Sequence, residues 1–157
     1  MISIQTEDFS LADEYAAIRR QAGDAGAIVT FTGLVRESYR DSAQGASEGA
    51  VQSLFLEHYP GMTEKCLNEI QQQACEKWPL LASRIIHRVG ELQSHDQIVF
   101  VATASHHRQA AFEAAEFMMD YLKSRAPFWK KQVTDAASSW IESRASDQAA
   151  IERWQKS

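Results

Sequence analysis

The segment Asp120-Tyr-Leu-Lys-Ser-Arg-Ala-Pro-Phe-Trp-Lys-Lys131 ends the longest predicted helix of the chain and turns the backbone into a new direction. Pro127 disfavours a helical conformation at the preceding residue, so we expect the helix to end at Ala126 and the chain to turn away at Phe128. The segment holds four cations and three aromatic side chains in a protein whose formal net charge is −5. A basic cluster in an acidic chain indicates a dedicated anion site rather than a generally basic surface.

Apolar spacing predicts the elements around this segment. The long helix extends from His107 to Arg125, and two shorter helices are predicted from Ser10 to Gly23 and from Thr63 to Trp78. Strands are predicted at 26–33, 51–59, 84–89 and 97–104. A connection at 90–96 joins the last two strands, and a mobile loop is predicted at about 37–50. Weaker final pieces lie near 140 and at 149–154. Because helices and strands do not alternate strictly, the predicted class is α+β, in one domain spanning 1–157.

Composition narrows the class of protein. Hydrophobic residues make up 45% of the 157 residues and charged residues 24%, as in ordinary globular chains. No apolar run reaches membrane-spanning length, and the N-terminus lacks the layout of a signal peptide, so we expect a cytoplasmic protein. The acidic charge balance argues against nucleic acid as the main partner.

Two lysines are the strongest candidates for chemistry. Lys123 lies in the last turn of the long helix, on the same face as Met119, and Lys130 comes after the helix break. The two lysines could therefore converge on one anion pocket. The alternative is that Lys123 only complements the negative end of the helix dipole.

Two further segments could bind anions. Ser105-His-His-Arg108 lies where a strand leads into the long helix, and free backbone N–H groups there would suit a phosphate or carboxylate, although a simple capping role is equally open. Arg36 comes after a strand end and could be a second anion ligand or a solvated side chain. The histidines do not have zinc spacing, and Cys66 and Cys75 lie too far apart along one predicted helix to bridge, so we expect no metal site and no disulfide.

Several blocks, in one order over roughly residues 5–154, resemble the large, catalytic subunit of molybdopterin synthase. The blocks are Val29-Thr-Phe-Thr-Gly-Leu-Val-Arg36, Leu56-Glu-His-Tyr-Pro-Gly-Met-Thr63, Ile86-His-Arg-Val-Gly-Glu-Leu92, Ser105-His-His-Arg108 and Met119-Asp-Tyr-Leu-Lys-Ser-Arg-Ala-Pro-Phe-Trp-Lys-Lys131. The resemblance implies a hammerhead-type α+β fold with mainly antiparallel strands and flanking helices. It also implies a homodimer within a heterotetramer, in which a small ubiquitin-like sulfur-carrier subunit inserts its C-terminal thiocarboxylate into each active site.

The implied reaction is a sulfur transfer that converts cyclic pyranopterin monophosphate into molybdopterin during molybdenum cofactor biosynthesis. The partner subunit would supply the sulfur, so no cofactor is expected. By the same resemblance Lys123 is the catalytic lysine beside the thiocarboxylate, and Lys130 binds substrate and stabilises negative charge. The remaining implied substrate-binding residues are Leu34, Val35, Arg36, His107, Arg108, Lys131 and Gln132, with Phe31 and Met119 packing nearby.

Which subunit of the dimer supplies each anion-binding residue stays open, and Arg108 is a candidate to serve the neighbouring site. Two other functions also fit the residue types. One is a non-catalytic module that binds the acidic tail of a carrier protein, and the other is a lysine enzyme that forms a Schiff base with a phosphorylated carbonyl compound.

Overall fold

The computed structural model describes residues 1–36, 51–134, 138–141 and 145–156, so the predicted loop at 37–50 lies outside the described residues. No helix in the described ranges combines the length and apolar character needed to cross a membrane. The elements are β1 (Ile2–Gln5), α1 (Leu11–Ala22), β2 (Ala27–Leu34), β3 (Val51–His58), α2 (Met62–Lys77), β4 (Leu80–Arg88), β5 (Gly90–Gln93), β6 (Gln97–Ser105), α3 (Arg108–Arg125), β7 (Phe128–Thr134), β8 (Ser138–Ile141) and α4 (Ala145–Gln155).

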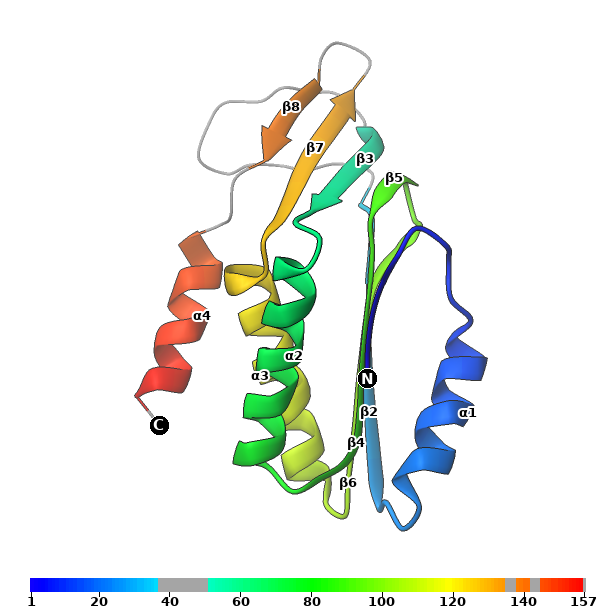
Figure 1. Ribbon diagram of the computed structural model, residues 1–157, viewed down its shortest axis with the longest axis vertical. Coiled ribbons are helices and arrows are strands. Elements are labelled where there is room, and N and C mark those ends of the chain that lie inside the picture. The colour runs from blue at the N-terminus through cyan, green and yellow to red at the C-terminus, as the bar shows by residue number, and fades with distance from the viewer. Residues whose placement is uncertain (37–50, 135–137, 142–144, 157) are drawn as a thin grey trace.

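The strands form two four-stranded sheets. Sheet A has the order β1-β4-β6-β2, and sheet B, at the upper end of the view in Figure 1, has the order β5-β3-β7-β8. β1 and β4 run parallel, and the other strand pairs of the described chain run antiparallel. This arrangement confirms the predicted α+β class with mainly antiparallel strands and flanking helices.

Helices cover both faces of sheet A (Figure 1). Along β6, Val99 and Val101 pack into the cluster formed with α2 and α3, whereas Phe100 and Ala102 pack into the cluster formed with α1. Successive side chains of a strand point to opposite faces, so one buried strand supplies both clusters. Sheet A is therefore the central layer on which the helices are fixed.

The predicted helix bounds agree closely with the structure. The Ser10 hydroxyl caps α1 by accepting a hydrogen bond from the Asp13 backbone N–H at 3.3 Å. The predicted connection at 90–96 was wrong in one respect, because it contains β5. Gly90 adopts φ +86°, which lets the chain bend directly after β4 and join sheet B beside β3.

The prediction that the chain turns away from α3 after Pro127 was incomplete, because a strand follows. Residues 128–134 form β7, which pairs with β3 on one side and β8 on the other. The weak final piece predicted at 149–154 belongs to the helix α4, which begins at Ala145. These strand pairings join segments far apart in the sequence, and local periodicity carries no information about them.

Candidate functional site

A cavity of about 390 Å³ lies between the C-terminal end of α3 and the adjoining ends of the two sheets. Residues from β2, β4, β6, α3, β7 and the start of α4 line it. Arg36, Lys123 and Lys130 are the Arg and Lys side chains among the lining residues that the structure describes. Three cations from separate segments of an acidic chain make this cavity suited to an anionic ligand.

The end of α3 and the start of β7 place the two lysines. Met119 and Lys123 lie one helical turn apart and both line the cavity. Ala126 has extended backbone angles (φ −71°, ψ 126°), so the helix stops there as predicted. On β7, Phe128 and Lys130 alternate onto the cavity side, whereas Lys131 falls on the other side of the strand and does not line the cavity.

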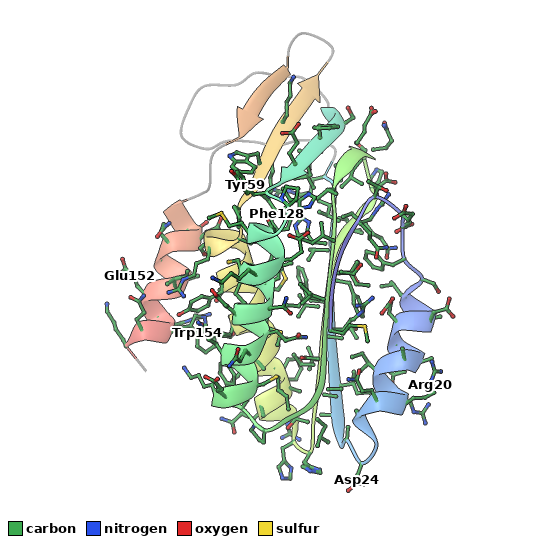
Figure 2. All side chains as sticks on the ribbon, in the orientation of Figure 1. Arg20, Asp24, Tyr59, Phe128, Glu152 and Trp154 are labelled. Carbon is green, nitrogen blue, oxygen red and sulfur yellow. The ribbon has the colours of Figure 1, made fainter. Side chains whose placement is uncertain are left out.

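The first turn of α2 anchors the bend between α3 and β7. The fully buried Thr63 hydroxyl donates a hydrogen bond to the Pro127 carbonyl oxygen at 3.1 Å and accepts one from the Tyr59 N–H at 2.9 Å. Beside it, the Cys66 thiol donates to the Arg125 carbonyl oxygen at 3.5 Å, and burial raises the pKa of this thiol. Figure 2 shows Tyr59 and Phe128 at the level where sheet B adjoins the helices.

The remaining predicted site residues near β2 and β7 differ in their position relative to the cavity. Leu34 lines the cavity. Val35 is almost wholly buried, and its N–H donates to the Asp96 carbonyl oxygen at 2.9 Å, so it supports the wall from behind. The Gln132 backbone pairs with β3 and β8, and its side chain is not described.

His107 and Arg108 lie at the opposite end of α3. Lys123 lies fifteen positions after Arg108, which corresponds to about 22 Å along the helix. Both side chains are exposed, and His107 occupies the N-cap position without a side-chain capping hydrogen bond. A single chain therefore does not bring these two residues to the cavity.

The cavity includes a histidine to which sequence reasoning assigned no role. His87 of β4 lies in its wall, with its ring stacked on Phe128 at a centroid distance of 3.8 Å and an interplanar angle of 15°. His87 belongs to one of the blocks that carry the family resemblance, and that block was the one signal for it. The position of His87 in the sequence did not indicate a site role. Its stacking partner, Phe128, comes from a strand 41 positions further along the chain.

Ser146 and Asp147, at the start of α4, also line the cavity and were not predicted. The Asp120 carboxylate holds α4 against α3, since it accepts hydrogen bonds from Trp154 Nε1 at 2.7 Å and Arg153 Nη2 at 3.0 Å. No sequence signal pointed to Ser146 and Asp147 as site residues, because their position depends on how α4 packs against α3.

The described residues include no group of three or more His, Cys, Asp or Glu side chains placed to hold a metal ion. The chemistry that the cavity offers is therefore that of cationic side chains, one imidazole, hydroxyls and the Asp147 carboxylate. Such groups can bind a phosphate and stabilise negative charge that develops during a reaction.

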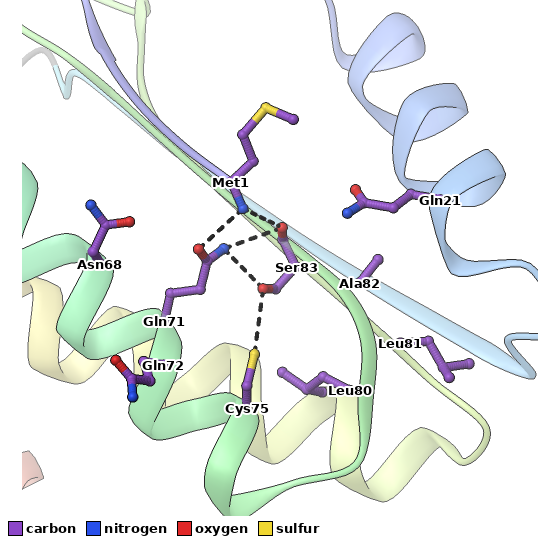
Figure 3. Close-up of a pocket in the computed structure, with 10 residues that line it drawn as sticks. All are labelled: Met1, Gln21, Asn68, Gln71, Gln72, Cys75, Leu80, Leu81, Ala82 and Ser83. Atoms are coloured by element: carbon purple, nitrogen blue, oxygen red, sulfur yellow. Dashed lines mark hydrogen bonds between the residues drawn. The ribbon is translucent and has the colours of Figure 1, made fainter.

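A second cavity, of about 430 Å³, lies between α2 and the N-terminal end of β4 and includes none of the predicted site residues. Figure 3 shows hydrogen bonds among four of its lining residues, which are Met1, Gln71, Cys75 and Ser83. The Met1 amino group donates to Gln71 Oε1 at 3.1 Å and to the Ser83 carbonyl oxygen at 3.2 Å, and Gln71 in turn donates to the Ser83 hydroxyl at 2.9 Å. Burial lowers the pKa of the Met1 amino group. We assign the candidate site to the first cavity.

Comparisons with known proteins find similar sequences and structures over nearly the whole chain. The sequence model of a family described as "MoaE protein" matches residues 4–125. A "Molybdopterin synthase catalytic subunit" of Vibrio cholerae is 55% identical over 155 residues, covering 98% of this chain and 97% of that protein. A "Molybdopterin biosynthesis MoaE protein" from Burkholderia ambifaria, of known structure, superposes with a TM-score of 0.82 at 46% identity, covering 99% of this chain and 97% of the other.

A more distant structure shows the same fold in a complex. It is a "Protein-protein complex of subunit 1 and 2 of Molybdopterin-converting factor" from Helicobacter pylori. The matching chain superposes with a TM-score of 0.72 at 17% identity, and each chain is covered to 91%. At this identity the likeness concerns the fold alone.

Proposed function

Because the chain belongs to the MoaE family, and is thus a molybdopterin synthase catalytic subunit of molybdenum cofactor biosynthesis, we propose that the cavity at the end of α3 is its sulfur-transfer site. The observation that carries this proposal is the meeting of Arg36, Lys123 and Lys130 in one cavity wall. Family membership favours catalysis over the two alternatives, a tail-binding module and a Schiff-base enzyme.

The substrate is cyclic pyranopterin monophosphate, and its phosphate is the anion that the cationic wall takes. Arg36 can donate two parallel hydrogen bonds to phosphate oxygens, which fixes the orientation of the group as well as neutralising it. Lys130 binds the substrate close to the reacting carbons and stabilises negative charge as it develops. Phe31, Leu34 and Met119, which also line the cavity, supply apolar surface for the pterin ring.

The sulfur donor is the C-terminal thiocarboxylate of a small, ubiquitin-like partner subunit. Lys123 is exposed at the mouth of the cavity, where the tail of a second protein can reach it. Its ammonium group would hold the thiocarboxylate against the pterin, and two successive transfers would build the dithiolene. The relatives are named as catalytic subunits, which supports a complex with a small subunit here as well.

We further propose that His107 and Arg108 act in the site of a neighbouring copy within a homodimer of a heterotetramer. Their distance from Lys123 along α3 leaves them no role in their own chain's cavity. Lys131 and Gln132 follow Lys130 on β7, and we propose a smaller contribution to substrate binding for them, because neither is among the described residues that line the cavity. Mixing a His107→Ala, Arg108→Ala chain with a Lys123→Ala chain tests this arrangement, because mixed dimers should recover part of the activity.

The decisive experiment combines the purified protein, the thiocarboxylated partner and the pterin substrate, and measures dithiolene product. Lys123→Ala should lose nearly all product while still binding the partner. Lys65→Ala is the matched control, because this lysine is exposed on α2 and away from the cavity. Full product from Lys123→Ala would overturn the catalytic assignment.

A further inference from the structure

The cavity contains one imidazole whose tautomer can be assigned. His87 is 4% exposed, and its Nδ1 lies 2.8 Å from the carbonyl oxygen of Arg88. A carbonyl oxygen only accepts hydrogen bonds, so Nδ1 must carry the proton. In the neutral ring Nε2 is then an acceptor with a free lone pair.

The acceptor nitrogen has access to the cavity. Within the described ranges, no side-chain nitrogen or oxygen is both sealed from solvent and without a hydrogen-bond partner. The hydrogen bond seen for the His87 side chain uses Nδ1, and no described residue donates to Nε2. Since His87 lines the cavity, Nε2 is open to that space rather than buried and unpaired.

The ring stays neutral and is held rigidly. Burial, together with the electrostatic effects of Lys130 and His58, lowers the pKa of His87 to about 4, against the opposing effect of the Arg88 carbonyl. Stacking on Phe128 fixes the plane of the ring. Phe128 and Lys130 lie on the same side of β7, so the imidazole and the lysine share one part of the wall.

The cationic side chains of the cavity offer no hydrogen-bond acceptor for the N–H groups of a pterin ring. Lys and Arg have only donors, which suits a phosphate, whereas the N–H groups of a pterin ring need acceptors. Among the ionisable side chains that line the described cavity, the acceptors are the His87 imidazole in the wall formed by the strands and the Asp147 carboxylate at the start of α4. His87 is the more deeply buried of the two, so a hydrogen bond there discriminates more strongly.

We propose that His87 is a substrate-binding residue whose Nε2 accepts a hydrogen bond from an N–H donor of the pterin ring, while the cations hold the phosphate. This inference rests on the proposed function and adds to it a residue that recognises the pterin ring by a hydrogen bond. It makes His87 a specificity determinant, because a ring with an acceptor at the same position would face the lone pair of Nε2.

The first test uses the wild-type protein labelled with ¹⁵N histidine. In the free protein, the His87 Nε2 resonance should have the position of an unprotonated nitrogen. At saturating cyclic pyranopterin monophosphate, without the partner, it should move towards the position of a hydrogen-bonded acceptor. An Nε2 resonance that stays unchanged at saturation overturns the proposal.

Variants provide an independent readout by calorimetric titration with the same substrate. His87→Phe keeps the stacking on Phe128 and removes the acceptor, and should weaken binding about tenfold. His87→Gln returns an amide oxygen and should recover most of that loss. Equal binding by His87→Phe and wild type, or a loss in Asp147→Asn alone, would place the acceptor elsewhere. Product formation by the wild-type preparation tests the proposed function separately, because it does not depend on either variant.

Discussion

The Thr63 hydroxyl donates a hydrogen bond to the carbonyl oxygen of Pro127 at 3.1 Å, across 64 positions of sequence. This contact joins the first turn of α2 to the bend between α3 and β7. Lys123 precedes the bend and Lys130 comes after it, so a side chain outside the cavity fixes the separation of the two lysines. Helix α2 thus positions the site without contributing to its wall.

Removing this hydroxyl should destabilise the protein. Thr63→Val keeps the shape of the side chain but leaves the Pro127 carbonyl and the Tyr59 N–H without their buried partner. We expect a loss of about 1–3 kcal/mol in the free energy of unfolding, measured by urea denaturation. Thr63→Ser is the control, since it retains the hydroxyl and should lose much less. Equal urea midpoints for Thr63→Val and wild type would contradict the anchoring role.

The two neighbouring lysines of β7 should differ in their effect on activity. Lys130 lines the cavity and Lys131 lies on the other side of the strand, so Lys130→Ala should lower kcat/KM about 100-fold. The loss for Lys131→Ala should be at least about tenfold smaller. Steady-state kinetics of product formation measures both. Equal losses would show that strand alternation does not decide which lysine meets the substrate.

Protonation of His87 should make stability depend on pH. Its pKa is about 4 in the folded protein and 6.5 for an unperturbed imidazole, so between these values the unfolded chain binds more protons and stability rises with pH. The contribution is complete above pH 6.5 and is lost as the pH falls towards 4. Between pH 7.5 and 5.0 it amounts to about 2 kcal/mol.

Urea denaturation at the two pH values, for wild type and His87→Gln, isolates this contribution. The variant lacks the imidazole but keeps Lys130 and His58, the charged or titratable groups that act on it. Its pH dependence should therefore be smaller than that of the wild type by the predicted amount. Parallel pH profiles would mean that His87 is not buried in its neutral form.

Helix α4 should loosen when its anchor is removed. Asp120 accepts hydrogen bonds from both Arg153 and Trp154, and α4 carries Asp147 at the cavity. We expect Asp120→Ala to increase hydrogen exchange throughout α4 while the amides of β6 keep their protection.

Glu116→Ala is the matched control, because Glu116 bonds Arg153 at 2.8 Å in a surface pair that is about half exposed on both sides. Exposed pairs of this kind contribute little, so the exchange of α4 should change far less than in Asp120→Ala. Similar exchange in the two variants would assign the docking of α4 to apolar packing instead.

Much of the fold could be predicted because its signals are local. Ser10 caps α1, and Pro127 ends α3 at Ala126 by a steric effect on the preceding residue. The two-residue alternation of side chains also predicted β3 over its full length, with one residue too many at its end. The strands β1, β5 and β7 were not predicted. Each is defined by pairing with a distant strand, as β5 is by pairing with β3, and no local pattern reports such pairing.

The sequence alone determined which residue types were present for the site. Lys123 and Lys130 stand on either side of a helix break, and the blocks around them carry the family resemblance, because both properties belong to short contiguous segments. Only the tertiary structure decided which of these side chains share a cavity. Packing between distant segments brought in Arg36, His87 and Asp147 and left His107 and Arg108 at the far end of α3. Which residues come together in the folded chain depends on the pairing of strands and the packing of helices. The spacing of residues along the sequence does not determine either.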